Sequence, residues 1–313
     1  MRHVLNSQQF SREILQQLFA RADQFRTRIE DPSERGALTQ LYRGKMLFSV
    51  FYEPSTRTRM SFSAAAEHLG ISVVTTENAR EFSSALKGES LEDTIRVLCE
   101  YYPDAIALRH YENGAAERAA AVSTVPIINA GDGSGQHPTQ ALLDLYTIHQ
   151  ALGTIDGLTV TIGGDLANGR TARSLAYLLA KFTGIQIRFV APPELRMGTD
   201  IKDHLEERRV PFKEENALDD ALSSSDVVYW TRVQKERLTP GKTPLGEGSS
   251  FVIGTKQMAQ LKPEAILMHP LPRLDEIPPE VDTDPRAWYF RQAGNGMLIR
   301  MALLEWILEK HEA

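Results

Sequence analysis

The chain has 313 residues, and this length predicts two domains rather than a single hydrophobic core. Hydrophobic residues make up 42% and charged residues 24%, which excludes a disordered chain and is typical of a soluble globular protein. The formal net charge of −6 argues against a partner nucleic acid, because broad nucleic-acid-binding surfaces are usually basic. Several basic residues fall in short segments that contain Gly, Ser, Thr or Pro, and this placement predicts a small anionic ligand.

The N-terminal stretch and the cysteine content bear on location. Residues 1–7 are too polar for a signal peptide, and no apolar run reaches the length of a membrane span. The single cysteine, Cys99, excludes an internal disulfide framework, and its apolar neighbours predict a buried structural thiol rather than a reactive one. We therefore expect a cytoplasmic protein with no membrane partner.

Apolar spacing in the first half of the chain predicts alternating helices and strands. The order strand, loop, helix, strand implies a parallel sheet. The predicted helices are 7–28, 57–69, 90–101 and 114–121, and the predicted strands are 45–52, 71–75, 105–108 and 125–129.

A Gly-rich loop at 131–135 then leads into a helix with Pro138 in its first turn, which ends near Gly153 and links the two halves. The second half repeats the alternation. Its predicted strands are 158–162, 185–190, 227–230 and 265–268, and its predicted helices are 172–182 and 296–310. We expect an α/β protein with two open parallel-sheet domains, 1–140 and 141–290, and a C-terminal helix, about 291–313, that packs back on the first. Ligands of such domains bind at the carboxyl ends of the strands, in the crevice between them.

The segment Ser-Thr-Arg-Thr-Arg at 55–59 directly follows a predicted strand and opens a predicted helix. Backbone N–H groups at a helix start point toward a ligand, and the helix dipole favours negative charge there. Hydroxyl groups and an arginine add directed donors to phosphate oxygens. The context favours a phosphate site over a capped surface helix with two solvated arginines.

Three further basic residues of the first half carry weaker signals. Lys87 lies beside a glycine in a Ser-rich segment and could reach a phosphate, although most such lysines are solvated. Arg109 ends a predicted strand, where a ligand contact and a surface salt bridge are equally compatible with the sequence. His137 stands at a predicted helix start, where the helix dipole disfavours a charged imidazole. A neutral imidazole there can donate to a carbonyl oxygen of a ligand and polarise it, or it can cap the helix.

In the second half, the loop at 163–170 invites a dinucleotide interpretation. The G-x-G-x-x-G fingerprint would need glycines where Asp165 and Asn168 stand, so we reject a nicotinamide cofactor. Arg170 instead lies at a strand-to-helix junction, and Arg232 follows another predicted strand. Both guanidinium groups suit carboxylates.

The segment His-Pro-Leu-Pro-Arg at 269–273 follows a further predicted strand, and its prolines stiffen the loop and leave its carbonyl groups available to an amide or an ammonium group. The first half thus offers a phosphate-binding segment and a pair that can polarise a carbonyl group, Arg109 with His137. The second half offers two cations for carboxylates, Arg170 and Arg232. Together they match a substrate with phosphate, carbonyl and amide groups, and a partner with two carboxylates and an amine.

These segments give the sequence a resemblance to the aspartate carbamoyltransferase family over essentially its whole length. Six motifs occur in the family's order, and the ending 287–296 is also similar. The motifs are Ser-Thr-Arg-Thr-Arg at 55–59, Lys-Gly-Glu at 87–89, His-Pro-Thr-Gln at 137–140, Gly-Arg-Thr at 169–171, Thr-Arg-Val-Gln at 231–234 and His-Pro-Leu-Pro-Arg at 269–273.

The resemblance implies transfer of the carbamoyl group of carbamoyl phosphate to L-aspartate in pyrimidine biosynthesis, with no cofactor and no metal. Residues 1–140 would bind carbamoyl phosphate and residues 141–290 L-aspartate. In carbamoyl phosphate, the carbonyl oxygen would be bound by Thr58, Arg109 and His137, and the phosphate by Ser55, Thr56, Arg57 and Thr58. Its amide nitrogen would be bound by Gln140 and the backbone carbonyls of Leu271 and Pro272. L-Aspartate would be bound by Lys87, Arg170, Arg232 and Gln234.

The resemblance also implies that Ser83 and Lys87 reach into a neighbouring subunit's site, so that a homotrimer with an intersubunit and interdomain cleft is the working unit. Glu53 and Arg237 resemble a pair that bridges the domains on closure, and the Gly-rich stretch 238–251 suggests a mobile loop. The sequence leaves open whether a regulatory chain binds.

Two alternatives remain. An ornithine carbamoyltransferase would call for a cysteine in the His-x-Leu-Pro loop, where Pro270 stands. A non-catalytic paralogue would have lost arginines from the motifs, and none is lost.

Overall fold

The structure, a computed structural model, describes residues 3–82, 84–216, 218–232 and 251–309. Contacts within the chain divide it into two compact units. The first unit is Met1–Thr139 with Gly294–Ala313, and the second is Gln140–Ala293. Within the described ranges, every helix is too short or too polar to cross a membrane.

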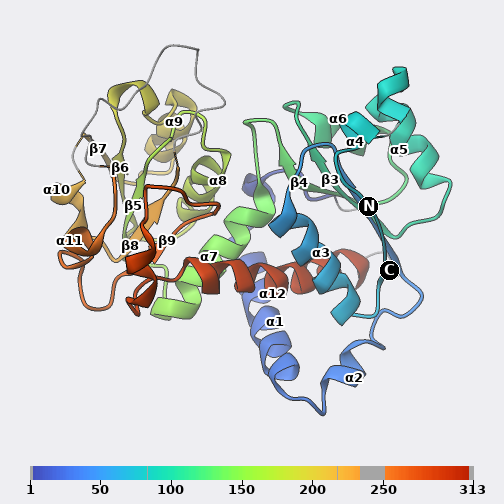
Figure 1. The fold of residues 1–313 in the computed structure, drawn as a ribbon, viewed down its shortest axis with the longest axis horizontal. Helices are drawn as coiled ribbons and strands as arrows, with labels where there is room; N and C mark the ends of the chain where they lie inside the picture. Colours follow the sequence, from blue (N-terminus) through green and yellow to red (C-terminus); the bar gives the residue numbers. More distant parts are fainter. Residues whose placement is uncertain (1–2, 83, 217, 233–250, 310–313) are drawn as a thin grey trace. The chain divides into compact units, whose positions relative to one another are not determined.

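The first unit contains a four-stranded parallel sheet in the order β2-β1-β3-β4 (Figure 1). Strands β1 and β3 are almost wholly buried, as expected of parallel strands covered on both faces, whereas the edge strand β2 is largely exposed. The strands are β1 (Met46–Phe51), β2 (Ser72–Thr76), β3 (Ala105–His110) and β4 (Ile127–Asp132).

The helices of the first unit follow from capping and apolar spacing. Ser11 accepts a hydrogen bond from Ile14 N and starts α1, and Ser90 does the same for Asp93 N at the start of α5. Helices α5 and α6 contact each other and supply Ile95 and Ala119 to the core over the sheet. The helices are α1 (Arg12–Glu30), α2 (Arg35–Leu38), α3 (Thr56–His68), α4 (Ala79–Phe82), α5 (Leu91–Cys99), α6 (Ala115–Val122) and most of α12 (Tyr289–Leu308), with 3-10 turns η1 (Ser7–Gln9) and η2 (Ser84–Lys87).

The second unit contains a five-stranded parallel sheet in the order β7-β6-β5-β8-β9 (Figure 1). Trp230 is fully buried in its core. The strands are β5 (Thr159–Gly163), β6 (Gln186–Val190), β7 (Phe212–Glu215), β8 (Val227–Trp230) and β9 (Ile266–Met268). The helical segments are α7 (Pro138–Leu152), which begins in the first unit, α8 (Arg170–Leu179), α9 (Thr199–Glu207), α10 (Asp219–Leu222), α11 (Thr255–Met258), η3 (Pro193–Leu195) and η5 (Pro279–Thr283).

The fold class expected from the sequence, two parallel-sheet α/β domains, is confirmed. Several expected boundaries are wrong by a few residues, and three of the differences concern the segments around the site or the chain ends. The helix expected at 7–28 is a 3-10 turn followed by α1, because Asn6 and Ser11 each start a separate helix. Strand β4 reaches Asp132, two residues into the expected Gly-rich loop. Helix α12 starts at Tyr289 rather than at 296, directly after Trp288 N donates to Leu267 O on β9, and its glycines lie inside the helix.

Candidate active site

In the first unit, three adjacent strands end in segments that carry predicted site residues. Tyr52 N, after β1, donates to Arg109 O on β3 at 2.8 Å, and Gly133 N, after β4, donates to His110 O at 2.9 Å. These hydrogen bonds tie the three connections to one edge of the sheet. The carboxyl ends of parallel strands are where ligands of open α/β sheets bind.

The connection from β1 to α3 has the form of an anion site. Ser55 occupies the position before the first helical residue, and its side chain makes no capping hydrogen bond. Thr58 is buried in the first turn, whereas Arg57 is exposed; desolvation lowers the pKa of Arg57, which keeps its charge at neutral pH. Arg59 is tied to Glu77 by a 2.6 Å ion pair. The arginine available to an anion is therefore Arg57.

Arg109 ends β3 beside this helix start. Its Nη1 donates to the carbonyl oxygen of Ala130 at 3.3 Å, and its Nη2 lies 3.3 Å from Glu53 Oε2. The side chain is 12% exposed, so the guanidinium is held in place but keeps access to solvent. A preoriented cation of this kind can stabilise negative charge that develops on a ligand oxygen.

His137 directly precedes α7 and is buried. The loop before it is fixed by Asp132, whose Oδ1 accepts from Gln136 N at 3.0 Å and whose Oδ2 accepts from Gly114 N at 3.0 Å. Gly133 has a φ of +44°, and a Cβ there would lie 2.1 Å from the side-chain oxygen of Asn113. The glycine is therefore required for the tight turn that delivers His137 to the helix start.

Lys87 lies on η2, which follows β2 in the same unit, and its side chain is exposed. The structure thus brings Thr58, Arg109 and His137 onto neighbouring connections, while Lys87 lies on a separate surface segment. Ser83, Gln234, Arg237 and residues 238–250 lie outside the described residues.

In the second unit, Arg170 and Arg232 follow neighbouring strands, β5 and β8. Thr231 Oγ1 donates to Gly163 O at 3.0 Å and accepts from Asp165 N at 3.1 Å, so the two connections are joined. A Cβ on Gly164, whose φ is +99°, would lie 2.0 Å from Thr231 O. Gly164 therefore allows close approach of two backbones, which is a different role from binding a dinucleotide.

The loop after β9 completes this edge of the second sheet, because β9 pairs with β8. His269 is buried; its Nδ1 accepts from Leu271 N at 2.8 Å, and its Nε2 lies 3.0 Å from Glu276 Oε1. Leu271 has a φ of +55°, and the Leu271–Pro272 peptide bond is cis. Arg273 is held by an ion pair with Asp282. The conformation of the loop, and with it the direction of its carbonyl groups, is fixed by side chains.

Gln140 lies in the first turn of α7, and its Nε2 donates to Asp144 Oδ1 at 2.8 Å. Asp144 is fully buried and also accepts from Gln292 Nε2 at 2.6 Å and from the Tyr229 hydroxyl at 2.9 Å. Sequence reasoning missed Asp144. The available signal was a lone carboxylate between leucines, one helical turn after Gln140.

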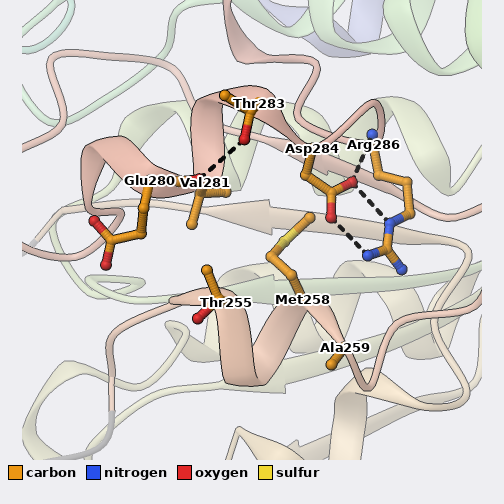
Figure 2. Close-up of a pocket in the computed structure, with 8 residues that line it drawn as sticks. All are labelled: Thr255, Met258, Ala259, Glu280, Val281, Thr283, Asp284 and Arg286. Atoms are coloured by element: carbon orange, nitrogen blue, oxygen red, sulfur yellow. Dashed lines mark hydrogen bonds and ion pairs between the residues drawn. The ribbon is translucent and has the colours of Figure 1, made fainter.

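A separate hollow of about 290 Å³ lies between α11 and η5 of the second unit (Figure 2). None of the predicted site residues lines it. Figure 2 shows that the Arg286 guanidinium faces Asp284, with an Nη2–Oδ2 distance of 2.7 Å, so its charge is neutralised within the hollow. The lining residues are Thr255, Met258, Ala259, Glu280, Val281, Thr283, Asp284 and Arg286.

The two units therefore each carry polar and cationic side chains at the carboxyl ends of parallel strands. The first presents a helix start, hydroxyl groups and arginines suited to a phosphoryl group beside a carbonyl oxygen. The second presents arginines suited to carboxylates and fixed carbonyl acceptors. Among the residues that the structure describes, no group of His, Cys, Asp or Glu could hold a metal ion. This arrangement is typical of an α/β protein that binds small anionic metabolites.

Comparisons with known proteins narrow this class. Residues 2–150 match the carbamoyl-phosphate-binding domain of the aspartate/ornithine carbamoyltransferases, and residues 156–307 match the Asp/Orn-binding domain. The chain belongs to the aspartate/ornithine carbamoyltransferase family. It is 52% identical to the chloroplastic aspartate carbamoyltransferase of Oryza sativa subsp. japonica, over 97% of this chain and 84% of the rice protein.

Solved structures agree with this assignment. The aspartate transcarbamoylase of Trypanosoma cruzi in complex with carbamoyl phosphate and aspartate superimposes with a TM-score of 0.91 at 40% identity, covering 98% of this chain and 97% of that one. The catalytic subunit of M. jannaschii aspartate transcarbamoylase gives a TM-score of 0.90 at 43% identity, covering 100% of both chains.

The comparisons contradict the expected cytoplasmic location. Relatives from rice and Arabidopsis thaliana, each 52% identical to this chain, are named as chloroplastic proteins. The expectation rested on a polar N-terminal stretch and a single buried cysteine. Neither feature distinguishes one thiol-reducing compartment from another, which is why it failed.

Proposed function

We propose that this chain transfers the carbamoyl group of carbamoyl phosphate to the amino group of L-aspartate, giving N-carbamoyl-L-aspartate and phosphate, a step of pyrimidine biosynthesis. The observation that carries the proposal is the joined set of connections after β1, β3 and β4, which presents Thr58, Arg109 and His137 next to an anion-binding helix start. The names of the similar proteins support it.

In this proposal the aspartate amine attacks the carbamoyl carbon, and negative charge grows on the carbonyl oxygen. Arg109, His137 and Thr58 stabilise that charge, and fixed donors do so without reorganisation during the reaction. The new C–N bond forms as the C–O bond to phosphate breaks. The departing phosphate takes the electron pair and accepts the proton of the amine, while Arg57, Ser55 and Thr56 stabilise its charge.

The carbamoyl amide nitrogen would be held by acceptors of the second unit, Gln140 and the backbone carbonyls of Leu271 and Pro272. Arg170 and Arg232, on the joined connections after β5 and β8, would bind the aspartate carboxylates together with Lys87 and Gln234. Holding two anions side by side would supply much of the rate acceleration through positioning.

We further propose that the working unit is a homotrimer in which Ser83 and Lys87 serve a neighbouring subunit's site. The exposure of Lys87 supports this, because its side chain extends from the surface of the first unit. Large apolar side chains are also exposed there, namely Met60 on α3 and Val74 on β2, two elements in mutual contact. Exposed apolar side chains on a sheet edge are often covered by another chain.

An assay of phosphate release from carbamoyl phosphate tests the proposed activity. Purified protein is supplied with either L-aspartate or L-ornithine, and the carbamoylated product is identified by mass. We expect release with aspartate and a much smaller rate with ornithine, because Pro270 stands where the ornithine-type loop would have a cysteine. Faster turnover with ornithine, or none with either amino acid, would overturn the assignment.

A further inference from the structure

The second unit contains a buried carboxylate, Asp144, that binds Gln140, one of the groups assigned to the carbamoyl amide nitrogen. Asp144 Oδ1 accepts from the Nε2 atoms of Gln140 and Gln292, at 2.8 and 2.6 Å, and Asp144 Oδ2 accepts from the Tyr229 hydroxyl at 2.9 Å. Burial, followed by the nearby charge of Asp144, raises the pKa of Tyr229, so the phenol stays protonated and donates. A carboxylate can only accept, and therefore each of these partners must turn a donor toward it.

This requirement fixes the orientation of Gln140. A glutamine amide has a carbonyl oxygen at one side and an amino group at the other, and either can face a polar ligand. The hydrogen bond to Asp144 uses one of the two N–H donors of Gln140 and turns its amino group toward the protein. The carbonyl oxygen Oε1 then lies on the other side of the amide, where it can accept a hydrogen bond from a ligand.

Asp144 also fixes the loop at 269–273, through Gln292. With its Nε2 committed to Asp144, Gln292 uses Oε1 to accept from His269 N at 2.9 Å. His269 Nδ1 in turn accepts from Leu271 N at 2.8 Å. The backbone N–H groups at the start of the loop are thus consumed inside the protein. Leu271 and Pro272 therefore offer their carbonyl oxygens to a ligand, and these oxygens are acceptors as well.

We infer that Asp144 is a positioning residue for the subsite that holds the amide nitrogen. By orienting Gln140 directly and the loop at 269–273 through Gln292, Asp144 makes this subsite present hydrogen-bond acceptors. Such a subsite selects an acyl phosphate that carries an NH2 group. This inference rests on the proposed function, which assigns Gln140, Leu271 and Pro272 to the amide nitrogen. Carbamoyl phosphate donates two N–H groups to such a subsite. Acetyl phosphate has the same shape but offers a methyl group, which would cover these acceptors without hydrogen-bonding to them and is therefore disfavoured.

The experiment compares carbamoyl phosphate with acetyl phosphate in wild type, Asp144→Leu, which has a similar size but no acceptor oxygen, and a matched control, Tyr229→Phe. The control also removes a hydrogen bond to the same carboxylate but keeps both amide orientations. The readout is the dissociation constant of each acyl phosphate, with inorganic phosphate as a probe of the first unit. In Asp144→Leu neither glutamine amino group keeps its acceptor, and we expect the preference for carbamoyl over acetyl phosphate to fall by about tenfold or more, which is the value of one well-placed hydrogen bond. Phosphate binding, and the preference in Tyr229→Phe, should stay within about twofold of wild type.

Other results would overturn the inference. One is an Asp144→Leu protein that binds phosphate normally and keeps the wild-type preference. Another is an equal loss in Tyr229→Phe, which would mean that Asp144 acts only on stability. Gln292→Met removes only the hydrogen bonds that connect Asp144 to the loop at 269–273, and it supplies the same test if Asp144→Leu fails to fold. An unchanged preference in Gln292→Met would contradict the role of the network. If wild type prefers carbamoyl phosphate yet carbamoylates no amino acid, the proposed function fails while the inference stands.

Discussion

Arg109 Nη2 lies 3.3 Å from Glu53 Oε2, so the guanidinium assigned to the carbamoyl oxygen is already paired with a carboxylate from the connection after β1. The family resemblance had assigned Glu53 to a pair with Arg237, which lies outside the described residues. In the structure, Glu53 and the Ala130 carbonyl together orient Arg109 from two sides. A cation held in this way is poised for charge that develops on a ligand.

The first prediction concerns this pair. Glu53→Gln should lower kcat by about tenfold, because Arg109 loses one of the two groups that orient it. The KM for carbamoyl phosphate should not rise, since a negative charge near a dianionic ligand has been removed. Steady-state kinetics in both substrates measures both quantities. A substitution that raises KM and leaves kcat unchanged would mean that Glu53 has no role in orienting Arg109.

His137→Ala should lower kcat by about a hundredfold while weakening carbamoyl phosphate binding far less, because a group that acts on developing charge contributes most in the transition state. His68→Ala, at the last residue of α3, is a matched control and should leave both constants near wild type. Titration calorimetry gives the affinity and a phosphate-release assay gives kcat. Equal turnover of His137→Ala and wild type would remove His137 from the mechanism.

Mixed oligomers test the shared site. Lys87→Ala and Arg109→Ala chains should each be almost inactive alone, and their mixture should regain part of the wild-type rate because some sites then contain neither substitution. Chains carrying distinguishable tags allow mixed trimers to be isolated before assay. Isolated mixed trimers that show no recovery would contradict a contribution of Lys87 to a neighbouring subunit.

The Glu276–His269 contact should make stability depend on pH. Burial raises the pKa of Glu276, but hydrogen bonds from His269 and from backbone N–H groups outweigh it, and the net pKa lies below its ordinary value. A carboxyl whose pKa is lowered by folding stabilises the native state above its unfolded pKa of about 4.3, and this contribution is lost as pH falls through the folded pKa. The Tm of Glu276→Gln should therefore lie below that of wild type at neutral pH.

The difference in Tm between wild type and Glu276→Gln should narrow as the pH is lowered below about 4.3. Differential scanning fluorimetry over this range measures it. Glu280→Gln, at an exposed position on η5, is the control and should track wild type throughout. A constant or widening difference would show that the Glu276 carboxylate contributes nothing through ionisation.

Much of the fold was predictable from the sequence because buried parallel strands are continuous apolar runs. Residues 46–51 and 227–230 are examples of such runs, each followed by a site segment. Strand β7, with the sequence Phe-Lys-Glu-Glu, was missed because an edge strand needs few apolar side chains. Helix α9 was missed as well, since only Ile201 and Leu205 are buried on it.

The site was predictable to the extent that its chemistry lies in motifs. Arg57 and His137 stand at helix starts, a position that strand–loop–helix patterns reveal. Asp144, Gln292 and Glu276 were not predicted, because their importance comes from hydrogen bonds across long stretches of chain. Asp144 and Gln292 are 148 residues apart in the sequence and 2.6 Å apart at their polar atoms. No local pattern encodes such a pair.

The proposed function requires that Arg57 binds the phosphoryl group and that Arg170 binds a carboxylate of aspartate. N-(phosphonacetyl)-L-aspartic acid joins a phosphonate to an aspartate, and its affinity for wild type, Arg57→Ala and Arg170→Ala can be measured by titration calorimetry. Arg173→Ala is the control, because Arg173 lies on the same helix as Arg170 and its side chain forms an ion pair with Asp200. We predict that Arg57→Ala and Arg170→Ala each weaken binding by about tenfold or more and that the control does not. Wild-type affinity in either Arg57→Ala or Arg170→Ala would contradict the proposed function.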